Sequence, residues 1–124
     1  MNKNETIVEI LNKCSINITN IDHLDGVLIE RDLLLNNERY NEIQKYIPEL
    51  KKVFSSSCMT ALQSNALSNQ KWPLINFVRQ ILKNINYKLT PIRKCDGYTK
   101  DNKKKYKRFF LIEKYKIIDK LSES

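Results

Sequence analysis

The sequence predicts an α+β protein, mainly helical, in which several helices precede a C-terminal β-hairpin. Apolar residues recur with the helical period through the middle of the chain, between Asn36 and Ile85. After Asn86 the composition changes to two segments rich in β-branched and aromatic residues, with a polar stretch between them. With 124 residues and 41% hydrophobic content, the chain can bury one core. We therefore expect one principal domain.

The first 35 residues carry weaker structural signals. Asn4 can cap a short helix that has one apolar side, and residues 27–29, after an Asp-Gly turn, can form a strand. Residues 31–35 fit either the end of a strand or a helical turn. We interpret residues 1–35 as an acidic accessory segment, through which the chain could form a homodimer.

Helical signals are clearer in the middle of the chain. Asn36 is a good N-cap, Leu35 and Tyr40 can form a hydrophobic staple, and Pro48 should kink or restart this helix. A run of three serines can then cap a third helix, residues 58–69. The main domain is therefore predicted to begin at Asn36 and to cover residues 36–115.

The fourth helix opens at Trp72-Pro73, because proline at the first helical position costs no hydrogen bond. Its apolar face is wide and comprises Leu74, Ile75, Phe77, Val78, Ile81, Leu82 and Ile85. Three residues, 69–71, connect it to the third helix, which is the connection that a helix-turn-helix needs.

The C-terminal composition predicts two strands, residues 87–95 and 106–115, joined by a long polar loop. Pro91 then belongs at a sheet edge or a bulge. The apolar run at residues 109–112 is assigned to the core. Residues 116–124 form a tail that can add one helical turn.

Charge is distributed unevenly along the chain, whose net charge is +8. Residues 1–50 contain five Lys/Arg and nine Asp/Glu, residues 51–86 contain five and none, and residues 87–124 contain twelve and five. An extended positive surface is expected from this split, and such surfaces attract polyanions. The alternative is that the lysines merely keep the protein soluble, although acids would then be expected among them.

Several classes of protein are not favoured. No apolar run is long enough to span a membrane, and the acidic N-terminus does not resemble a signal peptide, so we expect an intracellular protein that is not secreted. Three widely spaced cysteines offer neither a disulfide framework nor a zinc site. His23 is a lone histidine, and Cys58, near a helix start where a thiol pKa can fall, is expected to be buried. We expect no catalytic residues, no metal and no cofactor.

The order of two helices, a short turn, a third helix and a hairpin with a basic loop resembles winged-helix and helix-turn-helix nucleic-acid-binding domains over residues 36–115. The strand that winged helices have between their first two helices is not evident in this segment. Two stretches, Gln70-Lys71-Trp72-Pro73-Leu74 and Asp96-Gly97-Tyr98-Thr99-Lys100, also resemble small, poorly characterised proteins of large AT-rich DNA viruses. That second resemblance implies a role in viral genome handling.

The winged-helix resemblance implies which side chains would face nucleic acid. In that family the helix before the hairpin lies in the major groove, which here would present Asn76, Arg79, Gln80 and Lys83. An ordinary solvated helix face is the alternative for these four. The loop cations that could contact phosphates are Lys100, Lys103, Lys104, Lys105, Lys107 and Arg108. Supporting phosphate contacts are expected from Ser57, Thr60, Gln63 and Lys71, although helix capping explains Ser57 equally well.

These observations predict a small basic protein that binds double-stranded DNA through a helix-turn-helix and a lysine-rich wing. Transcription regulation or viral genome packaging would be its setting. The alternative is a winged-helix module for protein interaction or virion structure that makes no direct contact with nucleic acid.

Overall fold

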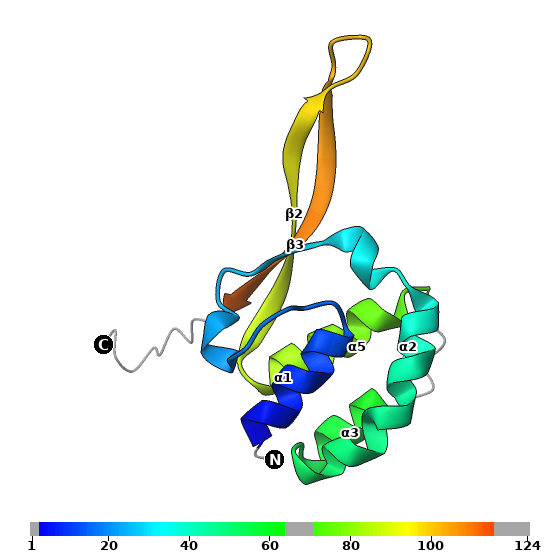
Figure 1. The fold of residues 1–124 in the computed structure, drawn as a ribbon, viewed down its shortest axis with the longest axis vertical. Coiled ribbons are helices and arrows are strands. Elements are labelled where there is room, and N and C mark those ends of the chain that lie inside the picture. The colour runs from blue at the N-terminus through cyan, green and yellow to red at the C-terminus, as the bar shows by residue number, and fades with distance from the viewer. Residues whose placement is uncertain (1–2, 64–70, 116–124) are drawn as a thin grey trace, which may run out of the picture.

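The computed structural model describes residues 3–63 and 71–115. Helices pack against one face of a three-stranded antiparallel sheet, and the hairpin of that sheet projects away from them (Figure 1). This confirms the predicted α+β class with its high helical content. With η denoting a 3₁₀-helix, the elements are α1 (Lys3–Lys13), η1 (Ile21–His23), β1 (Leu28–Glu30), η2 (Arg31–Leu34), α2 (Asn37–Ile43), η3 (Gln44–Lys52), α3 (Ser56–Leu62), α5 (Pro73–Asn84), β2 (Tyr87–Tyr98) and β3 (Lys104–Lys114).

The sheet has the order β1-β3-β2, so the hairpin gains a third strand from the first 35 residues. Ile29 of β1 is paired with Phe110 of β3, and both side chains are buried. The strand expected at residues 27–29 is thereby confirmed, shifted by one residue. The segment at 31–35, left open between strand and helical turn, forms the 3₁₀-helix η2.

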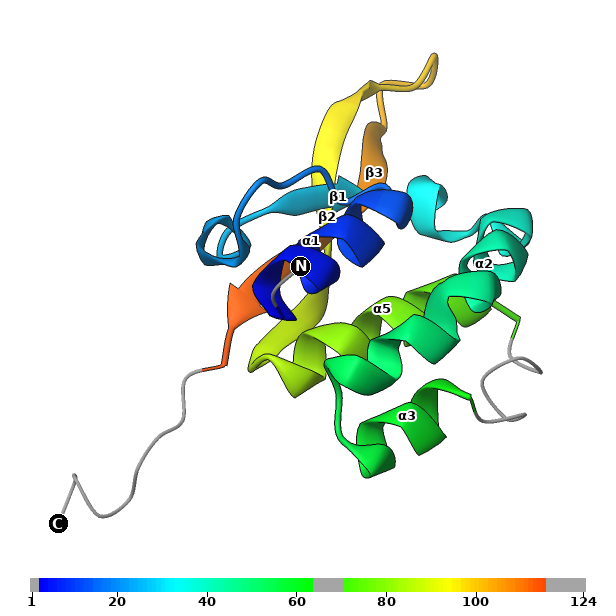
Figure 2. The same cartoon turned by 60° about the horizontal axis from the view of Figure 1, so that its bottom comes forward.

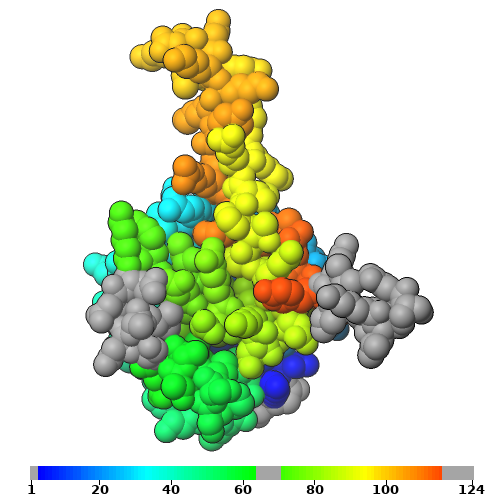
Figure 3. All heavy atoms as spheres, turned by 180° about the vertical axis from the view of Figure 1, so that it is seen from behind, coloured from blue at the N-terminus to red at the C-terminus, as the bar shows by residue number. Residues whose placement is uncertain are grey.

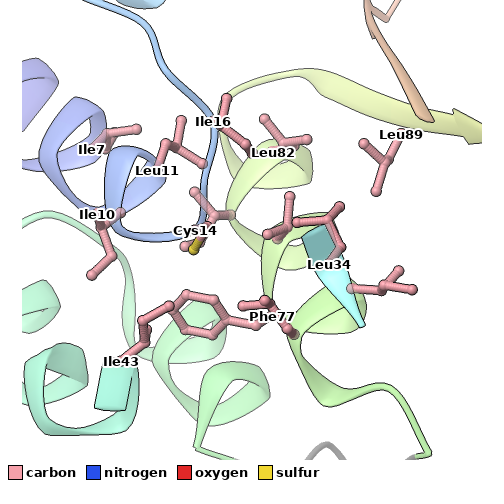
Figure 4. Packing of buried hydrophobic residues seen from close by; sticks show 14 of the residues in the cluster. Ile7, Ile10, Leu11, Cys14, Ile16, Leu34, Ile43, Phe77, Leu82 and Leu89 are labelled. Atoms are coloured by element: carbon pink, nitrogen blue, oxygen red, sulfur yellow. The ribbon is translucent and has the colours of Figure 1, made fainter. Parts of the chain in front are cut away.

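One hydrophobic core joins all parts of the described chain. Ile7 and Leu11 of α1 are fully buried in the same cluster as Phe77 and Leu82 of α5 (Figure 4). The predicted boundary at residue 35 therefore has no counterpart in the packing. The apolar side of α1 contacts η1 and η3 and is buried in the same cluster as residues of α5 and the sheet, which come much later in the sequence.

Pro48 divides the second helical segment as expected. The side chain of Asn36 accepts a hydrogen bond from the Arg39 N–H at 3.1 Å, which confirms the predicted N-cap of α2. The α-helix ends at Ile43, and the chain continues as η3, which contains Pro48. Proline cannot donate to the carbonyl four residues earlier, and its ring crowds that carbonyl, which here belongs to Gln44. The change from α to 3₁₀ geometry therefore begins at Gln44.

The helix before the hairpin, α5, is the central helix, and both α2 and α3 contact it (Figure 2). Its predicted apolar face is confirmed, with six residues buried and Ile85 half-buried. α3 begins at Ser56, two residues earlier than the predicted start at Cys58, and Ser55 is its N-cap. The rest of the predicted third helix and most of the predicted connection fall within residues 64–70, which lie outside the described residues, as does the 116–124 tail.

The hairpin strands are longer than predicted, and the loop between them spans only residues 99–103. The Thr99 N–H donates to the Lys103 carbonyl at 2.8 Å, which closes this loop. Asp96 and Gly97 were expected in the loop but lie inside β2, at an irregularity in its pairing with β3. Gly97 has φ +88°, a backbone conformation that favours glycine. Turn-forming residues can also form a bulge within a strand, so composition misplaced the loop.

The two faces of the sheet differ in what covers them. The front face is the one that α5 covers; it includes the cross-strand pairs Leu89–Ile112, Pro91–Phe110 and Arg93–Arg108. The back face includes Leu28, Ile92, Lys107, Phe109 and Leu111. Assigning all of residues 109–112 to the core was therefore wrong, because successive side chains of a strand point to opposite faces. Only the second and fourth of these residues are buried.

Candidate nucleic-acid interface

A hollow of about 350 Å³ lies on the front face, where α5 meets the base of the hairpin. Apolar side chains, including Trp72, Pro91 and Phe110, form part of its lining. Its charged lining consists of three cations from separate elements, Arg31 of η2, Lys71 before α5, and Arg79 of α5.

A second hollow of about 350 Å³ adjoins the first and shares two of its residues, Arg31 and Pro91. It adds Arg93 of β2 and Arg108 of β3, and its lining also includes Ile92 and Phe109 of the back face, so it reaches the edge of the hairpin. The two hollows together therefore bring five cations to the base of the hairpin. We call this set the basic cluster: Arg31, Lys71, Arg79, Arg93 and Arg108.

No carboxylate of the described residues neutralises the basic cluster. Neither hollow has an Asp or Glu in its lining, and none of the five cations forms an ion pair with the described residues. Three of them instead lie over aromatic rings: Lys71 over Trp72 at 5.4 Å, Arg79 over Phe110 at 5.8 Å and Arg93 over Tyr106 at 4.6 Å. Such contacts orient a cation without cancelling its charge. The hollows are thus suited to an anion.

Two cations of the basic cluster face each other across the hairpin. Arg93 and Arg108 are directly paired residues of antiparallel strands. Like charges in this position destabilise a sheet, although exposure to solvent screens the repulsion. A bound anion between or beside them would remove the repulsion.

The predicted recognition stripe runs along one side of α5, because Asn76, Arg79, Gln80 and Lys83 follow the i, i+3, i+4, i+7 spacing. Asn76 and Arg79 line the first hollow, whereas Gln80 and Lys83 line neither. In the space-filling view the surface of α5 lies directly below the base of the hairpin (Figure 3). The Asn76 amide also donates to the Trp72 carbonyl at 3.4 Å.

The predicted loop cations separate into groups. Lys100 and Lys103 lie in the loop and Lys104 and Lys105 begin β3, all exposed at the tip of the hairpin (Figure 1). Arg108 belongs to the basic cluster near the base. These residues therefore form an extended positive edge along the hairpin.

Lys107 is placed apart from the other predicted cations. Its side chain is on the back face and donates a 2.7 Å hydrogen bond to Oε1 of Glu30, with which it also forms an ion pair. This hydrogen bond, more than the surrounding carboxylates, raises the pKa of Lys107. Glu30 thus competes with any anion for this lysine.

The predicted supporting residues on α3 are not brought to the hairpin. Ser57, Thr60 and Gln63 belong to α3 or follow it, at the end of the molecule opposite the hairpin tip (Figure 1). The Thr60 hydroxyl donates to the Ser56 carbonyl at 2.9 Å, so it is occupied within the helix. Of the four supporting residues, only Lys71 belongs to the basic cluster.

Arg31 and Arg93 are members of the basic cluster that the sequence did not single out. Arg31 falls in the segment whose structure was ambiguous, and its approach to β3 depends on the pairing of β1. For Arg93 the sequence contained one signal. It is two residues after Pro91 in a predicted strand, so the two side chains are expected on the same face of the sheet.

In the described part of the chain, the side chains that could serve as metal ligands or as catalytic groups do not lie together in a site. No three of its His, Cys, Asp and Glu residues come together as a metal site. His23 is exposed, and its Nδ1 lies 3.4 Å from the Thr19 hydroxyl. Cys58 is half-buried, and burial raises the pKa of its thiol rather than lowering it. Among the described residues, no helix has the length and apolar character needed to cross a membrane.

Comparison of the chain with protein-family models, with curated proteins and with solved structures found no match.

Proposed function

We propose that this protein binds double-stranded DNA through the front face, with α5 in the major groove and the hairpin along the phosphate backbone. The observation that carries the proposal is the basic cluster: five cations, from η2, the segment before α5, α5 itself, β2 and β3, around two adjoining hollows whose lining, among the described residues, has no carboxylate. A positive surface of this kind gains affinity by releasing the counterions condensed on DNA.

The order of the elements supports a winged-helix reading of this fold. β1 lies between α1 and α2 in the sequence and pairs with β3 of the hairpin. We infer that it corresponds to the strand that winged helices have between their first two helices. The sequence predicts this strand at residues 27–29, but outside the domain that was expected to begin at Asn36.

The residues of the stripe on α5 would then have distinct roles. Asn76 and Gln80 carry amides that can pair with adenine, and the Arg79 guanidinium can contact guanine or a phosphate. Lys83 and the tip lysines would contact phosphates, which positions the protein without reading sequence. Affinity would come mainly from the hairpin and the basic cluster, and sequence preference from the helix.

Fluorescence anisotropy with a labelled random-sequence duplex at several salt concentrations tests the proposal. We expect micromolar or tighter binding, with log affinity falling by several units for each tenfold rise in salt. The Arg79→Ala variant should change the ranking of a panel of duplex sequences, since a base contact contributes about 1–3 kcal/mol of discrimination. Absence of binding at low salt contradicts the proposal.

A protein-interaction module is the second candidate, and the back face of the sheet favours it. Leu28 is 37% exposed there, beside the half-buried Ile92, Phe109 and Leu111. Light scattering on the wild type and on Leu28→Lys distinguishes this function. An oligomer that the substitution dissociates supports it, and a wild-type monomer at all concentrations counts against self-association through this face.

A further inference from the structure

The irregularity in β2 has a specific effect on Tyr98. Cys95 is paired with Tyr106, but three residues later in β2 Tyr98 is paired with Lys104, only two residues earlier in β3. One extra residue is therefore accommodated at Asp96-Gly97, as in a β-bulge. In a regular strand Tyr98 would lie on the back face. The bulge returns it to the front face.

We call the part of the hairpin between the Arg93–Arg108 pair and the tip the distal hairpin. On its front face, aromatic rings and cations continue outward from the basic cluster. Above Arg93 and Arg108 come Tyr106, then Lys104 and Tyr98. Directly paired residues share a face, and so do residues two apart in a regular strand, which places these five side chains together.

Packing does not explain the two tyrosines. Tyr98 is 66% exposed and Tyr106 45% exposed, on a hairpin that projects from the body (Figure 1). The Tyr98 ring makes no aromatic or cation contact, and its hydroxyl makes no hydrogen bond, with the described residues. Aromatic side chains stabilise folds chiefly by being buried. A ligand that covers these rings is therefore the more economical explanation for the bulge.

The positions of the two tyrosines in the hairpin suit unpaired bases. Tyr98 and Tyr106 are diagonal neighbours across the hairpin, a relationship that separates Cα atoms by about 7–8 Å. Stacked bases in duplex DNA are about 3.4 Å apart, so this distance is roughly two base steps. It leaves room for one base to stack between the two rings, which requires a strand whose bases are unstacked and unpaired. In an intact duplex only base edges are accessible.

Cations beside the rings supply the matching phosphate contacts. The Arg93 guanidinium lies 4.6 Å from the centre of the Tyr106 ring, and Lys104 is paired with Tyr98. Bases and phosphates alternate along a single strand. The rings can therefore stack on the bases while the neighbouring cations contact the phosphates.

We propose that the front face of the distal hairpin binds an unpaired DNA strand by stacking on Tyr98 and Tyr106. The preferred ligand is then a duplex that carries a single-stranded extension, with the duplex on α5 and the extension on the hairpin. This inference rests on the proposed binding of DNA and specifies its substrate.

Anisotropy with two probes tests it: a blunt duplex, and the same duplex with a thymine extension of about eight nucleotides. The wild type should bind the extended probe about tenfold or more tightly. Tyr98→Ala combined with Tyr106→Ala should remove this advantage, whereas Phe at both positions should retain it because the rings remain. Tyr115→Ala, which removes an exposed tyrosine beyond the end of β3, is the matched control and should behave as wild type.

Equal wild-type affinity for the two probes overturns the inference and leaves the proposed duplex binding standing. Retention of the advantage by the double alanine variant also overturns it. Failure of the wild type to bind either probe overturns both proposals. The comparison of probes on wild-type protein needs no variant, so it decides the matter even if a substitution disturbs folding.

Discussion

Arg93 and Arg108 are directly opposite each other in the hairpin, and neither has a carboxylate partner among the described residues. The repulsion between the two guanidinium groups destabilises the hairpin, and the same two charges favour a bound anion. A substitution that removes one of these charges should therefore stabilise the fold and weaken DNA binding. Arg93 has one compensating contact, with the ring of Tyr106.

Replacing Arg108 with Glu should therefore stabilise the fold while weakening DNA binding. An opposite-charge cross-strand pair contributes about 0.2–1 kcal/mol, and the repulsion from Arg93 is removed. Urea denaturation measures the first effect and duplex titration the second. Arg108→Lys, which keeps the charge, should change neither appreciably. A less stable Arg108→Glu variant, or one with wild-type affinity, contradicts this reading of the pair.

Glu30→Gln should strengthen DNA binding, because it releases Lys107 from its ion pair and removes one negative charge near the hairpin. Each additional phosphate contact steepens the salt dependence of log affinity by about 0.9. The same titration on Glu113→Gln, which disrupts the more loosely paired Lys88–Glu113 contact, controls for the change in net charge. A salt slope that stays unchanged in Glu30→Gln would show that Lys107 does not reach DNA.

Leu11→Ala should destabilise the whole described fold by about 2–5 kcal/mol, because this fully buried residue of α1 belongs to the common core. Denaturation should remain a single cooperative transition by both tryptophan fluorescence and circular dichroism. The exposed neighbour Glu9→Ala should have little effect. Loss of helical signal in a separate early transition would instead indicate that the first 35 residues fold on their own.

Cys14 should make stability depend on pH in the alkaline range. Burial raises the pKa of this thiol from 9.0 to about 12, and the Arg39 guanidinium opposes the shift in part. Below about pH 9 the thiol is protonated in both states, so its contribution is fully present. Between pH 9 and 12 the unfolded chain loses the proton first, and the free energy of unfolding falls by up to about 1.4 kcal/mol per pH unit.

The measurement is the difference in unfolding free energy between wild type and Cys14→Ala from pH 8 to 11. Other titrating groups cancel in this difference. We expect the wild type to lose stability relative to the variant as the pH rises, and parallel pH profiles would refute the assignment.

Local signals predicted much of the fold. Asn36, Pro48 and Pro73 act through hydrogen bonds within a few residues of themselves, so the sequence alone places the helix boundaries that they determine. The face of α5 follows from its 3.6-residue period. In the strands, by contrast, the continuous apolar run at residues 109–112 conceals the alternation between half-buried and buried side chains.

Long-range pairing is what the sequence left undetermined. β1 is only three residues long, and its place depends on β3, about eighty residues later. The basic cluster depends on the same pairing, because Arg31 follows β1 directly. The bulge that reorients Tyr98 is likewise a matter of register, which residue composition does not encode.

The most direct test of DNA binding through the basic cluster compares two triple variants that lose the same charge. One replaces Arg79, Arg93 and Arg108 with Gln; the other does so at three exposed lysines of η3, Lys45, Lys51 and Lys52. In salt titrations on a random-sequence duplex, the cluster variant should lose about 0.9 of salt slope per abolished phosphate contact, and the η3 variant should resemble wild type. Equal losses in both variants, or no wild-type binding at low salt, would contradict the account.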